Sequence, residues 1–305
     1  MLNSVSVIVS VYSKERLPHV IDCIGSLKVQ TLPPREIILV LDPDEDLTRF
    51  YRLKVSKDVR IVVSKSWGLS NARNAGVKHA SGEIVAFIDD DAVADERWLE
   101  RLVTAYNDPD VMGVGGLIRP LWEMDQPAWF PAELNWIIGC SYKGLPEQRA
   151  SVRNPIGCNM SFRREIFEKV GYFRTDVGRF GKTLLAGEEP EISMRILNHI
   201  PNSRIIYEPS AIVNHRVSRN RVSPQYMWRR SFYEGVSKAM MTDPKHSNSS
   251  FLSTENHYLH YLFRTAVPMR IRRIYLLKNL SQLMVLFCAS AAVFLGFSAG
   301  KLGQR

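Results

Sequence analysis

Three consecutive carboxylates, Asp89, Asp90 and Asp91, directly follow a short apolar run from Ile84 to Ile88. This run is typical of a strand buried on both faces of a parallel sheet. Like charges this close repel one another unless a cation or solvent compensates them. Strand pleating predicts that Asp89 and Asp91 point to one side and Asp90 to the other. We therefore expect an Asp-x-Asp clamp at the carboxyl end of a strand, where open α/β sheets bind ligands. The alternative is an acidic turn that only ends the strand.

A second acidic pair, Glu188 and Glu189, precedes Pro190. Pro190 is typical of the first residue of a helix, here over residues 190–200, so Glu189 is expected in an extended conformation at the helix cap. Glutamate is not a favoured cap residue, which suggests a functional reason for its presence. The alternative is that both are ordinary acids, favourably placed at a helix N-terminus.

The elements that position these acids alternate between strand and helix. Strands are predicted over residues 4–11, 36–41, 59–63 and 84–88, with helices between them, and this alternation indicates a doubly wound, mostly parallel sheet. No Gly-x-Gly-x-x-Gly follows the first strand, so a dinucleotide-dependent dehydrogenase is disfavoured. Asp42 follows one strand and the Asp89/Asp91 pair follows another. Their carboxylates could hold a base or ribose and a metal-bound diphosphate, respectively.

Composition bounds the class of protein. The 305 residues are enough for one large domain with a small appendage. The net charge of +9 is concentrated in a basic cluster before an uncharged run over 279–300, which favours a membrane surface over nucleic acid as the partner. Four dispersed cysteines indicate buried thiols in a reducing compartment. The first residues lack the pattern of a signal peptide.

Four motifs occur together in a recognisable order. They are Ser-Val-Ile-Val-Ser-Val-Tyr at 6–12, Glu-Ile-Ile-Leu-Val-Leu-Asp at 36–42, Gly-Leu-Ser-Asn-Ala-Arg-Asn-Ala-Gly at 68–76 and the three aspartates at 89–91. In these motifs the chain resembles the family 2 glycosyltransferases with the GT-A fold, from about Val5 to about Gly235. The resemblance implies an enzyme that binds a nucleotide-sugar through Mn²⁺ or Mg²⁺ and transfers the sugar with inversion.

The resemblance also implies roles for individual residues. The expected metal ligands are Asp89, Asp91 and His215, and the expected acceptor contacts are Gly157, Cys158 and Asn159. The family usually has Glu-Asp where this chain has Glu188-Glu189, so we expect Glu189 as the general base with Glu188 as the alternative. The expected nucleotide contacts are Val11, Tyr12, Glu15, Asp42, Ser70, Arg73, Asn74, Asp89 and Asp90.

The resemblance, together with the apolar C-terminal run, predicts three consecutive segments. Residues 1–118 are expected to bind the nucleotide-sugar, residues 119–240 the acceptor, and residues 241–305 to form a helical, membrane-associated appendage. Arg219 and Arg221, just after His215, are either phosphate contacts or solvated loop charges. The aromatic residues of a Pro-rich connection are either sugar or membrane contacts or core; they are Trp122, Trp129, Phe130 and Trp136.

The uncharged run over 279–300 is long enough to cross a bilayer, since ~20 helical residues span a ~30 Å hydrocarbon core. The alternative is a helix that lies against the catalytic domain. Upstream, aromatic and aliphatic residues alternate with the basic cluster, as in an interfacial helix. The positive-inside rule then places the catalytic domain in the cytoplasm. A membrane tail favours a lipid-linked acceptor such as a polyprenyl or dolichyl phosphate glycan, and the chain is most similar to archaeal glucuronosyl- and glucosyltransferases that extend such lipids.

Two other functions compete with sugar transfer. A nucleotidyltransferase also uses aspartates and a metal on an α/β sheet, but it needs a basic phosphate loop after the first strand, where only Lys14 and Arg16 are found. A non-catalytic, membrane-bound subunit that binds nucleotide-sugars would not need the complete set of acids. Nucleic acid is not an expected partner.

Overall fold

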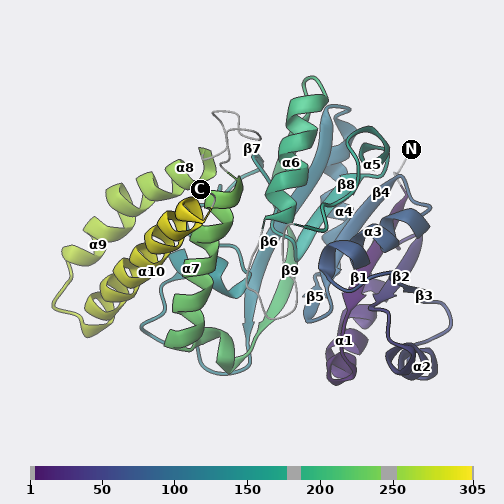
Figure 1. Ribbon diagram of the computed structural model, residues 1–305, viewed down its shortest axis with the longest axis horizontal. Coiled ribbons are helices and arrows are strands. Elements are labelled where there is room, and N and C mark those ends of the chain that lie inside the picture. Colours follow the sequence, from purple (N-terminus) through teal and green to yellow (C-terminus); the bar gives the residue numbers. More distant parts are fainter. Residues whose placement is uncertain (1–3, 177–186, 242–252, 304–305) are drawn as a thin grey trace. The chain divides into compact units, whose positions relative to one another are not determined.

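The computed structural model describes residues 4–176, 187–241 and 253–303, and shows strands and helices that alternate through the first half of the chain (Figure 1). The first four strands are parallel and lie in the order β3-β2-β1-β4. This confirms the predicted parallel sheet. The strands are β1 (Val5–Val11), β2 (Glu36–Leu41), β3 (Arg60–Val63) and β4 (Ile84–Asp89). The helices that follow the first three are η1 (Lys14–Arg16), α1 (Leu17–Lys28), α2 (Glu45–Lys54) and α3 (Leu69–His79).

The remaining strands extend the sheet with antiparallel pairs. β8 is antiparallel to both β4 and β6, and β9 is antiparallel to both β5 and β7. The spatial order is β3-β2-β1-β4-β8-β6-β9-β5, so the sheet is mixed. These strands are β5 (Ala92–Ala94), β6 (Val111–Trp122), β7 (Ala150–Val152), β8 (Asn159–Arg163) and β9 (Arg204–Val217).

The contacts group the chain into two units, each assembled from separate segments. The first unit holds residues 1–119, 146–181 and 188–215, and the second holds 120–145, 182–187 and 216–305. The sequence-based division was into three consecutive segments; residues 242–252, in the third, lie outside the described residues. The other helices are α4 (Trp98–Thr104), η2 (Ala105–Asn107), η3 (Ala132–Ile138), α5 (Ile166–Lys169), α6 (Glu188–His199), η4 (Arg219–Val222), α7 (Pro224–Met241), α8 (Ser253–Tyr261), the π-helix η5 (Leu262–Ala266), α9 (Val267–Ile271) and α10 (Leu277–Leu302).

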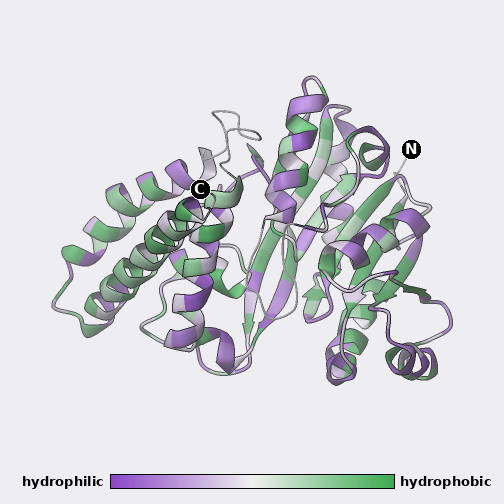
Figure 2. Ribbon diagram, viewed as in Figure 1, coloured by the Kyte–Doolittle hydropathy of each residue, from purple (hydrophilic) through white to green (hydrophobic). Residues whose placement is uncertain are grey.

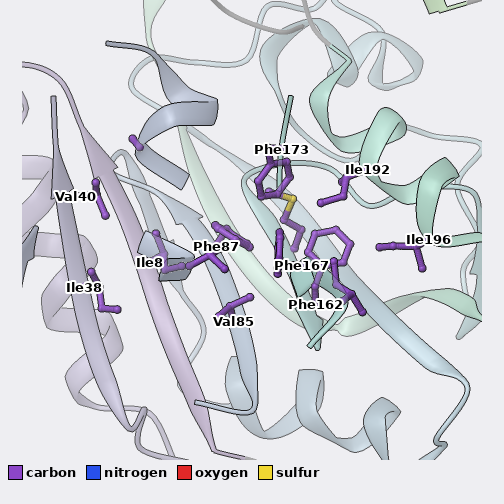
Figure 3. Close-up of a cluster of buried hydrophobic side chains, with 14 of the residues drawn as sticks. Ile8, Ile38, Val40, Val85, Phe87, Phe162, Phe167, Phe173, Ile192 and Ile196 are labelled. Carbon is purple, nitrogen blue, oxygen red and sulfur yellow. The ribbon is translucent and has the colours of Figure 1, made fainter. Parts of the chain in front are cut away.

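A cluster of buried apolar side chains holds the first unit together (Figure 3). It joins Ile8 of β1 and Phe87 of β4 to Phe162 of β8 and to Ile192 and Ile196 of α6. Alternate strand residues point to opposite faces of a sheet, and residues of the other parity, such as Val7 and Val9, are also buried. Both faces are therefore covered, as expected of the parallel strands.

Helix α2 was not identified in the sequence. It begins after Asp44, whose Oδ1 accepts a hydrogen bond from Leu47 N at 2.8 Å, the usual role of an N-cap aspartate. The signal was present, because Glu45 and Asp46 follow in the first helical turn. The helix matters to the site because its Tyr51 hydroxyl donates to Ser13 O at 2.9 Å and so holds the loop after β1.

Candidate active site

Asp91 and His215 lie together because the short strand β5 pairs with β9. Asp91 directly precedes β5, and the register places Ala92 opposite His215. His215 Nε2 lies 3.1 Å from Asp91 Oδ1, and both side chains are buried. β5 was not identified in the sequence, although it is the element that brings these two expected metal ligands into contact.

The arrangement of the three aspartates differs from the expected one. β4 ends at Asp89, and Asp90 and Asp91 form a turn before β5. Arg16 Nη1 lies 3.2 Å from Asp90 Oδ1 and 2.7 Å from Asp91 Oδ2, so both carboxylates face one guanidinium. The prediction that Asp90 and Asp91 point to opposite sides is therefore wrong, because strand alternation applies only while the backbone stays extended.

Arg16 was not expected in the site from the sequence. Its Nη2 donates to the Tyr12 hydroxyl at 2.8 Å, and its guanidinium lies 5.2 Å from the centre of the Tyr12 ring. Burial disfavours the charged form, but Asp90 and Asp91 outweigh it and raise the pKa of Arg16. The arginine thus supplies a permanent positive charge beside two acids. The available signal was a basic residue just after a strand that ends at the same edge as β4.

Asp42 lies at the adjacent strand end. β1 and β2 pair through Val11 and Leu41, and Asp42 N donates to Val11 O at 3.2 Å. Burial raises the pKa of Asp42, while a hydrogen bond from the Gly68 N–H opposes the shift. Gly68 has φ = 109°, a conformation that favours glycine. Asp42 and the start of α3, including the buried Ser70, therefore meet at the edge where ligands are expected.

Arg73 of α3 joins the two glutamates of α6. Its Nη1 lies 3.1 Å from Glu189 Oε1 and 3.5 Å from Glu188 Oε1, and the residue is only 2% exposed. Burial disfavours the charged arginine, but Glu189 and Glu188 raise its pKa above the usual value. The two glutamates expected as base candidates are thus held by the buried guanidinium of Arg73.

Helix α6 begins at Glu188, so Pro190 is its third residue. The expectation that Glu189 is extended at the cap is therefore wrong. The first-turn N–H groups of a helix have no intrahelical acceptor, so a proline at the third position costs the helix no hydrogen bond.

Gly157 and Cys158 connect the two groups of polar residues. A Cβ on Gly157 would lie 2.1 Å from Glu189 Oε1 and 2.6 Å from Arg73 Nη2, so the backbone approaches the ion pair closely. The next residue, Cys158, has its sulfur within 4.8 Å of side-chain donor atoms of Asp89 and His215. Because consecutive Cα atoms are about 3.8 Å apart, the base candidates and the candidate metal ligands are neighbours.

Asn159, expected to contact the acceptor, is fully buried. Its Nδ2 donates to Leu117 O at 3.1 Å and to Ala211 O at 2.9 Å. Its Oδ1 accepts from the Trp98 indole at 2.8 Å. These buried partners satisfy the side-chain amide and tie β8 to two other strands and to α4, and the acceptor role of Asn159 stays a prediction.

Two other expected nucleotide contacts have local partners. Asn74 donates to Phe173 O at 2.8 Å and accepts from Phe173 N at 2.9 Å, so its amide joins α3 to the loop before α6. Glu15 is exposed and accepts a hydrogen bond from the Ser13 hydroxyl, which lowers its pKa. Their roles as nucleotide contacts stay predictions.

The residues after His215 lie in the second unit, which is described separately from the first. Arg219 lines a pocket with Trp122, Glu123, Met124 and Asp125. Arg221 Nη1 lies 3.4 Å from Ile138 O. Of the aromatic residues whose role was left open, Phe130 is buried, whereas Trp122, Trp129 and Trp136 are half-buried.

The donor set fits a divalent cation. Carboxylate oxygens are the ligands that Mg²⁺ prefers, and imidazole together with carboxylate suits borderline cations such as Mn²⁺. Asp89, Asp91 and His215 provide these atoms, whereas the thiol of Cys158 is a softer ligand. All three residues belong to the first unit.

Comparisons with known proteins agree with this geometry. Residues 6–171 match the family described as Glycosyl transferase family 2. The chain is 35% identical to the glucosyl-dolichyl phosphate glucuronosyltransferase of Haloferax volcanii, over 98% of this chain and 96% of that protein.

Two solved structures share the fold. The mannosyltransferase PcManGT from Pyrobaculum calidifontis, in complex with GDP-Man and Mn²⁺, has a TM-score of 0.60 at 18% identity. That match covers 100% of this chain and 88% of PcManGT. GalNAc-T7, solved with UDP, GalNAc and Mn²⁺, has a TM-score of 0.54 at 17% identity. The match covers 88% of this chain but only 57% of GalNAc-T7. These similarities confirm the predicted GT-A fold.

Proposed function

Because the chain belongs to glycosyltransferase family 2, we propose that it moves a sugar from a nucleotide-diphosphate donor to a lipid-linked glycan, with inversion at the anomeric carbon. The observation that carries the proposal is the contact between Gly157 and Glu189 next to the cluster of Asp89, Cys158 and His215. It brings a candidate base beside a candidate diphosphate site, which a single displacement requires.

The donor side uses the strand ends of the first unit. Asp42 and Ser70 lie where a nucleoside would bind, and Asp89, Asp91 and His215 would hold Mn²⁺ or Mg²⁺. A bound divalent cation offsets the negative charge that grows on the leaving diphosphate. The positive charge of Arg16 lies on the same acids and would have to move away from Asp91 when the site is filled.

The acceptor side uses the ion pair of Arg73 with the glutamates. The acceptor hydroxyl oxygen bonds to the anomeric carbon while the bond from that carbon to the diphosphate oxygen breaks, and the hydroxyl proton passes to Glu189. Arg73 holds the Glu189 carboxylate in place at 3.1 Å. Glu188, which is more buried, is the alternative base.

The substrate class is proposed from the relative in Haloferax volcanii, named a glucosyl-dolichyl phosphate glucuronosyltransferase. We propose a glucuronosyl or related hexosyl donor and a polyprenyl or dolichyl phosphate glycan as acceptor. The 35% identity over nearly the whole of both chains supports this choice.

A lipid-linked acceptor requires access to a membrane. Among the described residues, α10 is a helix long and apolar enough to cross one, as predicted for residues 279–300. We propose that the chain attaches to the membrane through α10. We also propose that its catalytic residues face the cytoplasm, because the basic cluster at Arg272, Arg273 and Lys278 beside this helix is attracted to the anionic lipids of the cytoplasmic leaflet.

The test is nucleotide release from a panel of nucleotide-sugars, with and without Mn²⁺, in the presence of a short dolichyl phosphate glucoside. We expect one donor to give Mn²⁺-dependent release coupled to a longer lipid-linked glycan. Donor binding without release would favour a non-catalytic subunit. Pyrophosphate release from a nucleoside triphosphate would favour a nucleotidyltransferase.

A further inference from the structure

One face of α10 is packed against the rest of the second unit along most of the length of the helix. Its buried residues recur every three or four positions, as one helical face requires; they are Gln282, Leu286, Ala289, Ala292 and Gly296. The helix is therefore part of a folded unit and not an isolated rod (Figure 1).

Polar and charged groups of the second unit lie against the start of this buried face of α10. Gln282 accepts from Arg270 Nε at 2.9 Å and donates to Ala128 O at 2.8 Å. Arg270 in turn forms a two-fold ion pair with Glu133, with nitrogen–oxygen distances of 3.0 and 2.7 Å, and Glu133 is fully buried. A charged pair is thus built into the layer on which α10 packs.

Helix α7 lies against the end of the same face. A Cβ on Gly296 would be 1.9 Å from Phe232 O, and a Cβ on Gly235 would be 2.0 Å from Val293 O, so the two backbones are in contact. In the same turns α7 carries an ion network, because Glu234 lies 2.8 Å from Arg230 and 3.3 Å from Lys238.

The opposite face of α10 is exposed and apolar. Its large side chains also recur at helical spacing, and they are Leu277, Leu280, Met284, Phe287, Phe294 and Leu302. Exposed apolar residues continue through the preceding turn at Ile271, Ile274, Tyr275 and Leu276. Figure 2 shows hydrophobic colour along α10 and purple hydrophilic stretches on α7.

We infer that α10 lies in the plane of an anionic membrane surface and does not cross the bilayer. A crossing helix would carry α7 with its ion network, or the Glu133–Arg270 pair, into hydrocarbon, where charged groups are costly. An in-plane helix buries only its exposed face at the headgroup boundary.

Charge complementarity identifies the partner as an anionic lipid surface. Arg272, Arg273 and Lys278 are exposed beside the apolar stripe, and the sequence from Leu262 to its end holds no acidic residue. Basic residues at a membrane surface each add to the attraction for anionic lipids.

The side of the membrane on which each terminus lies distinguishes an in-plane α10 from one that crosses the bilayer. The full-length chain would carry one epitope tag before Met1 and another after Arg305, and protease access would be measured in spheroplasts and in sealed inverted vesicles. We expect both tags to be cut only in inverted vesicles. A C-terminal tag cut in spheroplasts, with the N-terminal tag protected, would show a span and overturn the inference.

This inference rests on the proposed membrane attachment, and the two fail differently. Recovery of the full-length chain in the soluble fraction without detergent would contradict attachment itself. A tag on the outer side would contradict only the in-plane orientation.

Vesicle binding tests the surface directly. The double variant Phe287→Asp, Phe294→Asp should bind vesicles of phosphatidylcholine and phosphatidylglycerol at least about tenfold more weakly. The matched control is Leu53→Asp, at a leucine on α2 that is 78% exposed, and it should bind normally. Cys288 is an exposed thiol whereas the other three cysteines are buried, so its reaction with a water-soluble maleimide should slow when vesicles are added.

The basic cluster needs its own control. Changing Arg272, Arg273 and Lys278 to Gln should weaken binding to anionic vesicles at low salt and remove most of its salt dependence. The same changes at the exposed Arg52, Lys54 and Lys57 should have no such effect. A dimer that binds no vesicles would assign the apolar stripe to a second copy and overturn the inference.

Discussion

Arg16 shows how a single side chain can hold an acidic site together before its ligand arrives. Its guanidinium lies within 2.7 and 3.2 Å of oxygens on Asp91 and Asp90, which would otherwise repel each other. The same acids are the ones proposed to face a divalent cation. Arg16 and the cation therefore compete for Asp91.

Replacing Arg16 tests this competition without an activity assay. Arg16→Gln should lower stability in metal-free buffer by about 1–3 kcal/mol, because two largely buried carboxylates each lose the guanidinium as an ion-pair partner. Mn²⁺ should then raise the melting temperature more than it does in the wild type. Arg97→Gln, which breaks an exposed pair with Glu100, is the control. Unchanged stability and an unchanged Mn²⁺ response would contradict the competition.

Asp91→Asn tests the proposed cation site. The change removes a charge but little volume, so the fold should persist while Mn²⁺-dependent turnover is lost. Isothermal titration with Mn²⁺ should show weaker binding, independently of catalysis. Asp58→Asn, at an exposed aspartate, should leave both measurements unchanged. Full activity of Asp91→Asn in saturating Mn²⁺ would rule out the role.

The two glutamates on α6 are distinguished by their matched glutamine variants. Glu189→Gln keeps the size of the side chain but cannot accept the proton, so sugar transfer should fall by roughly 10²- to 10⁴-fold with little change in donor affinity. Glu188→Gln should cost less. If Glu188→Gln is the slower variant on the same acceptor, the roles are reversed. If both retain transfer, Asp176, which is exposed and paired with Arg174, becomes the next candidate.

At the scale of residues, the family resemblance grouped Asp91 with His215, and the two side chains are in contact. The contact between Arg73 and Glu189 was not predicted. Arg16 was missed because its long side chain reaches the acids from another element. The burial of Asn159 was also not visible in the sequence, which does not show that its amide is satisfied inside the core.

At the scale of elements, the buried strands β1 to β4 were predictable, whereas helix α2 and the short strand β5 were missed. β2 has the predicted bounds, and β1 and β4 differ by one residue, since buried strands form continuous apolar runs. β5 has only three residues and no periodicity. α6 begins two residues early because helix starts depend on cap geometry that proline alone does not determine.

Helix α7 is expected to give the second unit an acid-sensitive transition. Burial alone would raise the pKa of Glu234, but Lys238 and Arg230 lower it to about 2 from an ordinary 4.5. A depressed pKa contributes stability that is present above the unfolded value and lost as pH falls through the folded value. Unfolding free energy should therefore decrease between pH 4.5 and about 2. Glu234→Gln should be less stable at pH 7 and flatten this part of the profile, and an unchanged profile would contradict the assignment.

At the scale of the whole molecule, the sequence indicated consecutive segments, and the contacts in the structure group the chain into two units that are each discontinuous in sequence. Residues 120–145 and 216–305 form one unit although 70 intervening residues separate them. Local composition shows where an apolar run begins, but it does not show that Arg270 forms an ion pair with the distant Glu133. The C-terminal segment is therefore a component of a folded unit and not only a terminal anchor.

Truncation tests this difference. A removable anchor, as the sequence analysis implied, would leave a soluble and active fragment ending at Arg264. The structure predicts otherwise, because the cut removes Arg270 from the fully buried Glu133 and removes the helix that packs on Gly235. An unpaired buried charge costs about 3–5 kcal/mol, to which the lost apolar burial adds. The fragment should aggregate on size exclusion in detergent, whereas a chain ending at Leu302, which keeps α10, should behave as the full-length protein does. A monodisperse fragment ending at Arg264 that hydrolyses donor at the full-length rate would show that the segment is dispensable after all.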